Sequence, residues 1–315
     1  SAQSDADDII FTQQDGITKL PHEIEEYTST GSLTAWVQVP ELSDTADLDI
    51  YMYYNNPRAK NSEQPHIVWN NNYAGVWHLG DGDSTATEFY KDSTANRNHG
   101  TLTDANGNAT EVAGKLDGAV NFVGTDADYI SVGSAQSFNL DGEITVTAWI
   151  KTAVTSDDVF NRMSASKTNW RLRDTAGDMS FSISDGTNSP SANGNVLIDD
   201  NNWHFAVGIR DTISDTVSLY IDGVLDASAT DTTTGSIVDQ TASAIIGIRG
   251  SDFRSITRLY LGLDPLRIDP DSCRRAGRCA QHWVGQYRRD KCAAHRQQMA
   301  GGSHRVARCG EGRGA

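Results

Sequence analysis

Leu219 to Ala227 reads LYIDGVLDA, and this stretch predicts a β-hairpin more clearly than any other in the chain. Asp222 and Gly223 separate two runs of apolar and β-branched residues. Both residue types tolerate the positive φ that a two-residue type I′ turn requires. The stretch therefore indicates two antiparallel strands joined by a tight turn.

Short strand-like runs with partial alternation recur on both sides of this hairpin, bounded by Gly, Asp, Asn or Pro. They include AVNFVG (119–124), YISVG (129–133), EITVTAWIK (143–151), MSFSIS (179–184), HFAVGIR (204–210) and SAIIGI (243–248). No convincing 3.6-residue amphipathic pattern occurs before residue 270. Strands at this spacing without helices between them favour an all-β, antiparallel β-sandwich.

Charge divides the chain into two parts. Residues 1–250 hold 13 Lys and Arg against 36 Asp and Glu, a net charge of −23, and residues 251–315 hold 13 against 6, a net charge of +7; the sum is −16. An acidic body is repelled by nucleic acids and anionic lipids, and no apolar run has the ~20 residues of a spanning helix. The sequence therefore predicts no nucleic-acid partner and no direct membrane insertion.

Several motifs after Pro65 resemble one known family in their order and spacing: VWHLGDG (76–82), KDSTANRNHGTL (91–102), NNWHFAVGIRD (201–211) and AIIGIRG (244–250). Together with the strands above, they are similar to a LamG-like domain of the concanavalin A-like lectin/glucanase superfamily. The resemblance covers roughly residues 66–253. It implies a jelly-roll β-sandwich that binds a glycan or a surface protein outside the cell, sometimes with calcium.

Residues 1–65 resemble part of domain of unknown function 2341, which often precedes LamG-like modules in prokaryotic surface proteins. The first strands expected for that domain are absent, so we expect a partial N-terminal β module. Pro57 and Pro65 bracket a polar stretch that predicts the boundary between the two domains.

The expected function is that of an extracellular or cell-surface, adhesion-type binding module within a larger prokaryotic protein. A retaining glycosidase needs two carboxyl groups ~5 Å apart, and no Glu-x-Asp-x-x-Glu pattern supplies them. The sequence therefore predicts no enzyme. A glycoside hydrolase of the same superfamily and a purely structural spacer stay open as alternatives, and the sequence leaves the oligomeric state open.

Two loops carry hard oxygen ligands of the kind that calcium prefers. Asp92, Asn96 and Asn98 lie in KDSTANRNHG, and Asp126 and Asp128 lie in TDADYI. A site built from both loops would hold one Ca²⁺. The same residues are also common turn formers, so a purely structural role stays open.

Sugar rings stack on exposed aromatic side chains. Trp170, between Asn169 and Arg171, is the best surface candidate for such a ligand-binding site, followed by Tyr73 and Tyr90. Trp77, Trp149 and Trp203 are expected in the core, and a packing role for the three candidates stays open as well.

Residues 254–315 differ from the rest of the chain. They hold all four cysteines, Cys273, Cys279, Cys292 and Cys309, and twelve Arg against one Lys. The cysteine spacing fits neither a zinc knuckle nor a known disulfide pattern. We therefore expect an irregular tail, disordered or read out of frame, with few long-range contacts, although SITRLYL (255–261) alternates as a strand would.

Overall fold

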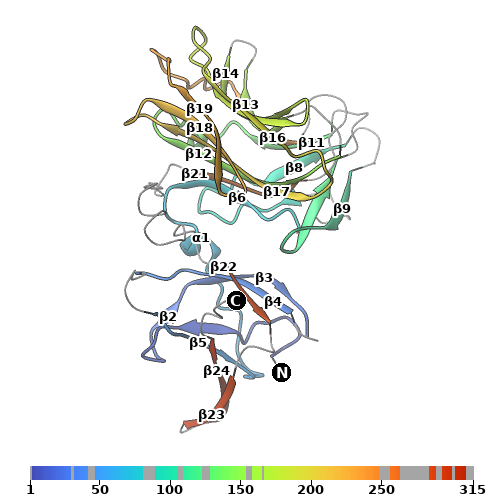
Figure 1. The fold of residues 1–315 in the computed structure, drawn as a ribbon. Coiled ribbons are helices and arrows are strands. Elements are labelled where there is room, and N and C mark those ends of the chain that lie inside the picture. Colours follow the sequence, from blue (N-terminus) through green and yellow to red (C-terminus); the bar gives the residue numbers. More distant parts are fainter. Residues whose placement is uncertain are drawn as a thin grey trace. The chain divides into compact units, whose positions relative to one another are not determined.

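The computed structural model describes residues 2–29, 32–41, 47–80, 89–104, 109–122, 128–153, 158–164 and 167–247, and the backbone of strands within 256–309. The chain forms two compact units: unit 1 is Ser1–Val68 with Leu266–Ala315, and unit 2 is Trp69–Pro265. Each unit is built from antiparallel β-sheets (Figure 1).

Unit 1 contains a five-stranded and a three-stranded sheet. In spatial order, the first holds β2 (Lys19–Leu20), β1 (Ile10–Thr12), β5 (Ile50–Tyr54), β24 (Gly302–Cys309) and β23 (Ala293–Met299), and the second holds β22 (Val284–Arg288), β4 (Ser32–Val37) and β3 (His22–Tyr27). The short helix α1 (Pro65–Val68) ends the N-terminal segment of unit 1. Phe11, Leu20, Leu33 and Ile50 are among the apolar side chains that form its core.

The C-terminal segment pairs with the N-terminal module. Strand β22 pairs with β4, and β24 pairs with both β5 and β23. The expectation of few long-range contacts after residue 264 is therefore wrong for these three strands. An open sheet edge presents unpaired backbone N–H and C=O groups, with which a strand of any composition can pair. Cys273, Cys279 and Cys292 lie outside the described residues.

Unit 2 is an antiparallel sandwich of two sheets, which we call sheet I and sheet II. Sheet I holds β19 (Val224–Thr230), β18 (Thr216–Ile221), β17 (Trp203–Asp211), β12 (Ile144–Lys151), β21 (Ile256–Gly262), β10 (Gly118–Asn121) and β9 (Thr110–Ala113), with β6 (Tyr73–Trp77) paired to β21. Sheet II holds β16 (Ser191–Leu197), β15 (Asp178–Ile183), β14 (Thr168–Thr175), β13 (Asp158–Met163), β20 (Ser243–Gly247), β11 (Tyr129–Gly133), β8 (Gly100–Thr103) and β7 (Phe89–Tyr90). One turn of 3₁₀ helix, Gln136–Phe138, follows β11.

The predicted hairpin is confirmed. Strands β18 and β19 pair through Ile221 and Val224, and Asp222 and Gly223 have φ values of 51° and 83°. Both turn residues thus adopt the left-handed conformation that a type I′ turn requires.

Strand β21 extends unit 2 beyond the expected limit of residue 253. Its backbone pairs with β12, β10 and β6, so it lies inside sheet I and not at an edge. From Ile256 on, the SITRLYL stretch therefore supplies a central strand of this sheet.

The core between sheets I and II follows from strand alternation. In β12, Ile144, Val146, Ala148 and Ile150 are fully buried, and the residues between them are half-buried. Trp77 and Phe160 pack edge to face at 5.7 Å between ring centroids. Successive side chains of a strand point to opposite faces, so one face of each sheet forms the core and the other is left for a ligand or solvent.

Candidate functional site: a polar outer face of sheet II

Strand β14 turns an aromatic ring inward and polar side chains outward. Trp170 and Leu172 are fully buried in the core, and the ring centroid of Trp170 lies 4.8 Å from that of Phe160. The prediction that Trp170 is solvent-accessible is therefore wrong. Its alternation partners Asn169 and Arg171 lie on the outer face of sheet II.

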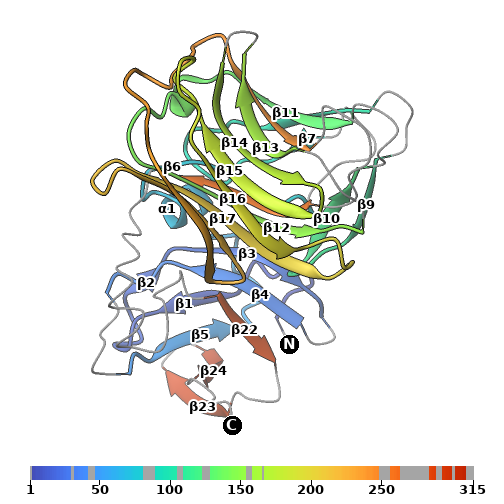
Figure 2. The same cartoon turned by 45° about the horizontal axis from the view of Figure 1, so that its top comes forward.

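Strands β13, β14 and β15 lie side by side in sheet II (Figure 2). Strands β13 and β15 add polar residues to the same face as Asn169 and Arg171. The backbone register aligns Ser182 of β15, Arg171 of β14, Asn161 of β13 and Ile245 of β20 in one row across the sheet. In the adjacent row, Arg173 lies opposite Asp158 and Ser180. We define the polar face by six residues: Asp158, Asn161, Asn169, Arg171, Arg173 and Asp178.

One carboxylate of the polar face is already neutralised. The Nε of Arg171 donates to Oδ1 of Asp158, and the Nδ2 of Asn161 donates to Oδ2 of Asp158 at 3.1 Å. The Asp158 side chain is only 5% exposed, against 23% for Arg171. This ion pair links β13 to β14 and leaves Asp158 committed to neighbours within the sheet.

Five other polar atoms of this face are buried without a hydrogen-bond partner. They are Oδ1 of Asn161, Oδ1 and Nδ2 of Asn169, Nε of Arg173 and Oδ1 of Asp178. Asn161 and Asn169 are each 1% exposed. A buried polar group that lacks a partner costs about 1–3 kcal/mol of stability, and native proteins keep few of them. Their concentration on one sheet face marks this face as the candidate ligand site.

Buried arginines fix the loops beyond the Asn169 end of this face. The guanidinium of Arg162 is fully buried and donates to main-chain oxygens of Phe138, Asp239 and Ala242. Burial lowers the pKa of Arg162, while the charge of Asp239 opposes that shift. The contacts tie the 3₁₀ turn to the connection between β19 and β20.

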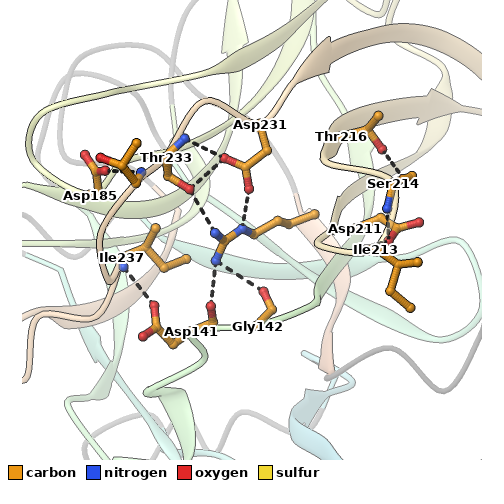
Figure 3. A network of polar contacts seen from close by, with 12 residues as sticks. Asp141, Gly142, Asp185, Asp211, Ile213, Ser214, Thr216, Asp231, Thr233 and Ile237 are labelled. Atoms are coloured by element: carbon orange, nitrogen blue, oxygen red, sulfur yellow. Dashed lines mark hydrogen bonds and ion pairs between the residues drawn. The ribbon is translucent and has the colours of Figure 1, made fainter.

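A second arginine network holds the start of that connection (Figure 3). Arg210 donates to the Asp231 carboxylate at 2.7 Å, to the main-chain oxygen of Asp141 at 2.7 Å and to Oγ1 of Thr233 at 2.9 Å. Asp185 accepts hydrogen bonds from the main-chain nitrogens of Thr234 and Gly235, and also from Thr187 and Asn188. Four backbone donors hold the pKa of Asp185 far below its ordinary value.

His204, near the start of β17, joins two loops at one end of sheet I. Its Nδ1 lies 2.8 Å from Oδ2 of Asp222, and its Nε2 lies 3.1 Å from Oδ1 of Asp200. Burial lowers the pKa of His204, but the hydrogen bonds and charges of both aspartates outweigh this effect and raise it above its ordinary value. The pKa of Asp200 falls to about 2, chiefly through hydrogen bonds from Asn202. Two acceptors around one imidazole favour the doubly protonated ring.

The predicted calcium ligands Asp92, Asn96 and Asn98 do lie together, but their hydrogen bonds stabilise their own loop. Asp92 is 4% exposed and accepts hydrogen bonds from the main-chain nitrogens of Val76 and Thr94, at 3.0 and 2.9 Å, and of Asn98, at 2.8 Å. The amides of Asn96 and Asn98 each donate to the main-chain oxygen of Ala74. These contacts fix the loop onto β6.

Asp128 is fully buried next to β11, and Asp126 lies outside the described residues. Within the part of the chain that the structure describes, no group of three His, Cys, Asp or Glu side chains is placed to hold a metal ion. Calcium binding by these two loops stays a prediction.

The other aromatic candidates are also placed by strand alternation. Tyr90 is 1% exposed and belongs to the core, whereas Tyr73 is half-buried with its ring 5.4 Å from that of Trp69. Trp77 is in the core as expected. The expectation is wrong for Trp149 and Trp203, which are half-buried on the outer face of sheet I.

Sequence reasoning missed Asn161, Asn169, Arg173 and Asp178. A signal was available, since TNWRLRDT (168–175) alternates an apolar set, Trp170 and Leu172, with a polar set, Asn169, Arg171 and Arg173. Because Trp170 and Leu172 alternate with polar residues, they are expected on the same, buried face of the strand. This pattern predicts the ring in the core and its neighbours on the outer face.

Two family models match the chain. Residues 124–261 match the concanavalin A-like lectin/glucanases superfamily, in a model of the laminin G type. This match lies within unit 2. Residues 5–100 match a domain of unknown function, DUF2341, so this second match extends from unit 1 into the first strands of unit 2. No curated protein matches the chain.

Solved structures with a similar fold include binding domains of clostridial toxins. The ligand-binding domain of botulinum neurotoxin serotype D, solved with N-acetylneuraminic acid, is 14% identical with a TM-score of 0.50, and the match covers 74% of this chain and 58% of that one. The binding domain of paraclostridial mosquitocidal protein 1 is 15% identical with a TM-score of 0.49, over 62% of this chain and 50% of that one. The chain thus spans about half the length of the toxin domains that it matches. At this identity, the likeness to these solved structures concerns the fold alone.

Proposed function

We propose that unit 2 is a non-catalytic glycan-binding module that acts outside the cell as part of a larger protein. The observation that carries this proposal is the polar face, where Oδ1 of Asn161 and both amide atoms of Asn169 are buried without a hydrogen-bond partner. Sugars offer many hydroxyl groups, each of which donates and accepts hydrogen bonds, so a glycan can satisfy these groups. Ligand sites in proteins fix their ligands through a few well-placed polar groups.

The comparisons support binding more than catalysis. The superfamily includes both lectins and glucanases, so the fold alone does not decide between them. The toxin domain of similar fold binds N-acetylneuraminic acid. Among the described residues, no helix is long and apolar enough to cross a membrane. An extracellular site of action rests on the family resemblance and on the acidic body of the chain.

The placement of the carboxylates argues against a glycoside hydrolase. Asp158 and Asp178 are the two acids of the polar face, two strands apart and two residues out of register. A glycosidase needs two carboxyl groups that both face the scissile bond, and Asp158 is instead held within the sheet by Arg171.

A glycan array with the full chain tests the proposal, followed by titration calorimetry with the oligosaccharides that bind. Asn169→Leu is expected to abolish binding and to raise the melting temperature, because it removes a buried amide without partners. Thr145→Val is the matched control: Oγ1 of Thr145 is also buried without a partner, but it lies on sheet I. This control should keep full affinity.

Three outcomes would contradict the proposal. If Asn169→Leu and the parent chain bound with equal affinity, the binding site would lie outside the polar face. Turnover of the same oligosaccharides would make the protein a hydrolase, and an array without any bound glycan would favour a surface-protein ligand or a spacer role.

A further inference from the structure

We infer that the ligand of the polar face is an uncharged glycan and that Arg173 and Asp178 share one of its hydroxyl groups. This inference rests on the proposed function and names the class of ligand for the same site. Three observations support it: the charge balance of the face, the types of its unpartnered atoms and the register of β14 with β15.

The charges of the polar face cancel. Arg171 and Arg173 are balanced by Asp158 and Asp178, and the first arginine is already paired with Asp158. The remaining pair, Arg173 and Asp178, brings one positive and one negative group to the same part of the sheet. An anionic ligand would meet Asp178 as well as Arg173, in a chain whose net charge is −16.

The unpartnered atoms comprise both donors and acceptors. The Nε of Arg173 and the Nδ2 of Asn169 donate, whereas Oδ1 of Asn161, of Asn169 and of Asp178 accept. A carboxylate or sulfate group accepts hydrogen bonds only, so an acidic group placed directly against these atoms would leave the three acceptors unsatisfied. A hydroxyl group both donates and accepts, and a ligand rich in hydroxyls can satisfy the whole set.

Strand register makes Arg173 and Asp178 diagonal neighbours. Arg173 lies opposite Ser180. Asp178 lies two residues before Ser180 in β15, opposite Thr175. Diagonal neighbours in an antiparallel pair are roughly 7–8 Å apart at Cα, within reach of a long side chain. Their inner atoms, Nε and Oδ1, are both buried without a hydrogen-bond partner. One sugar hydroxyl can accept from Nε–H of Arg173 and donate to Oδ1 of Asp178.

Neutral gluco-, galacto- and manno-configured oligosaccharides should therefore bind, and sialylated or sulfated ones should not. The affinity should vary by less than about twofold between low and high salt, because no net charge is neutralised on binding. The direction in which Asp178→Asn changes the affinity distinguishes a neutral from an acidic ligand. This substitution should weaken the binding of a neutral glycan about tenfold, whereas it would strengthen the binding of an acidic glycan by removing a like charge. Arg173→Met should weaken binding by a similar factor.

The experiment separates the two levels of the proposal. Binding that is restricted to acidic glycans, falls steeply with salt and improves in Asp178→Asn would overturn this inference and leave the glycan-binding function intact. Binding to no glycan at all would overturn the proposed function. Circular dichroism and the melting temperature confirm that each variant is folded, and Thr145→Val is again the control on the opposite sheet.

Discussion

The Nε of Arg210 lies 2.7 Å from Oδ2 of Asp231, and the two side chains are only 8% and 5% exposed. The pair fixes the first residues after β19 against the last residues of β17. A buried charge that loses its partner is costly, because its desolvation is no longer compensated. This relationship therefore controls the stability of the loop that borders the Asn169 end of the polar face.

Asp231→Ala should lower the free energy of unfolding by roughly 3–5 kcal/mol, because it leaves the Arg210 guanidinium buried without its carboxylate. Chemical denaturation measures this loss. The double variant Arg210→Met, Asp231→Leu should be more stable than the two single losses predict when added together. Strict additivity would mean that the two side chains are not coupled.

The same pair gives a pH dependence. Burial raises the pKa of Asp231, but hydrogen bonds from Thr233 and Arg210 outweigh burial and set it below the ordinary value. The stabilisation is therefore present above the unfolded pKa of about 3.9 and is lost as the pH falls through the folded value. Asp231→Asn should remove this part of the acid sensitivity in denaturation curves measured between neutral and acid pH.

The contribution of His204 to stability depends on pH in the opposite direction to that of Asp231. The folded pKa of His204 lies above the unfolded value of about 6.5, so its stabilisation is fully present below that pH and is lost as the pH rises through the folded value. The stability gap between the parent chain and His204→Gln should thus be larger at acid than at alkaline pH. Asp222→Asn keeps the left-handed turn, which asparagine tolerates, and should lower the pKa of His204 as followed by NMR. An unchanged His204 titration in Asp222→Asn would contradict the paired geometry.

Trp170 should behave as a core residue. Trp170→Ala removes a fully buried ring and should cost about 3–5 kcal/mol of unfolding free energy. Ser182→Ala, on the outer face of the neighbouring strand, is the matched control and should change stability by less than about 0.5 kcal/mol. If the Trp170→Ala chain were as stable as this control, the ring of Trp170 would not be packed in the core.

Calcium can be tested separately at the two loops. Asp92→Ala removes the acceptor of several buried donors and should cost about 2–4 kcal/mol, equally in calcium and in chelator. At the other loop, the prediction is that millimolar calcium raises the melting temperature of the parent chain and that Asp126→Asn removes this shift. A shift of the same size in both chains would exclude Asp126 as a ligand.

The sequence alone predicted the all-β class, the hairpin at Asp222 and Gly223 and a strand at β12. These features depend on interactions between residues that are near one another in the chain, namely turn conformation and strand alternation. The resemblance to the concanavalin A-like superfamily, drawn from motifs between residues 66 and 253, is confirmed by the family model over residues 124–261.

Other features were decided only by the tertiary structure. Alternation divides TNWRLRDT into two sets of residues, but only the packing of sheet II against sheet I makes the face of Trp170 the inner one. Strand β21 pairs with β12 although more than a hundred residues separate them, and no local pattern specifies such a pairing. Asn161 and Asn169 come from two strands that a register brings together. The site was hidden in the sequence because it depends on which distant strands become neighbours, and that choice is made by burial of the whole core and not by any one segment.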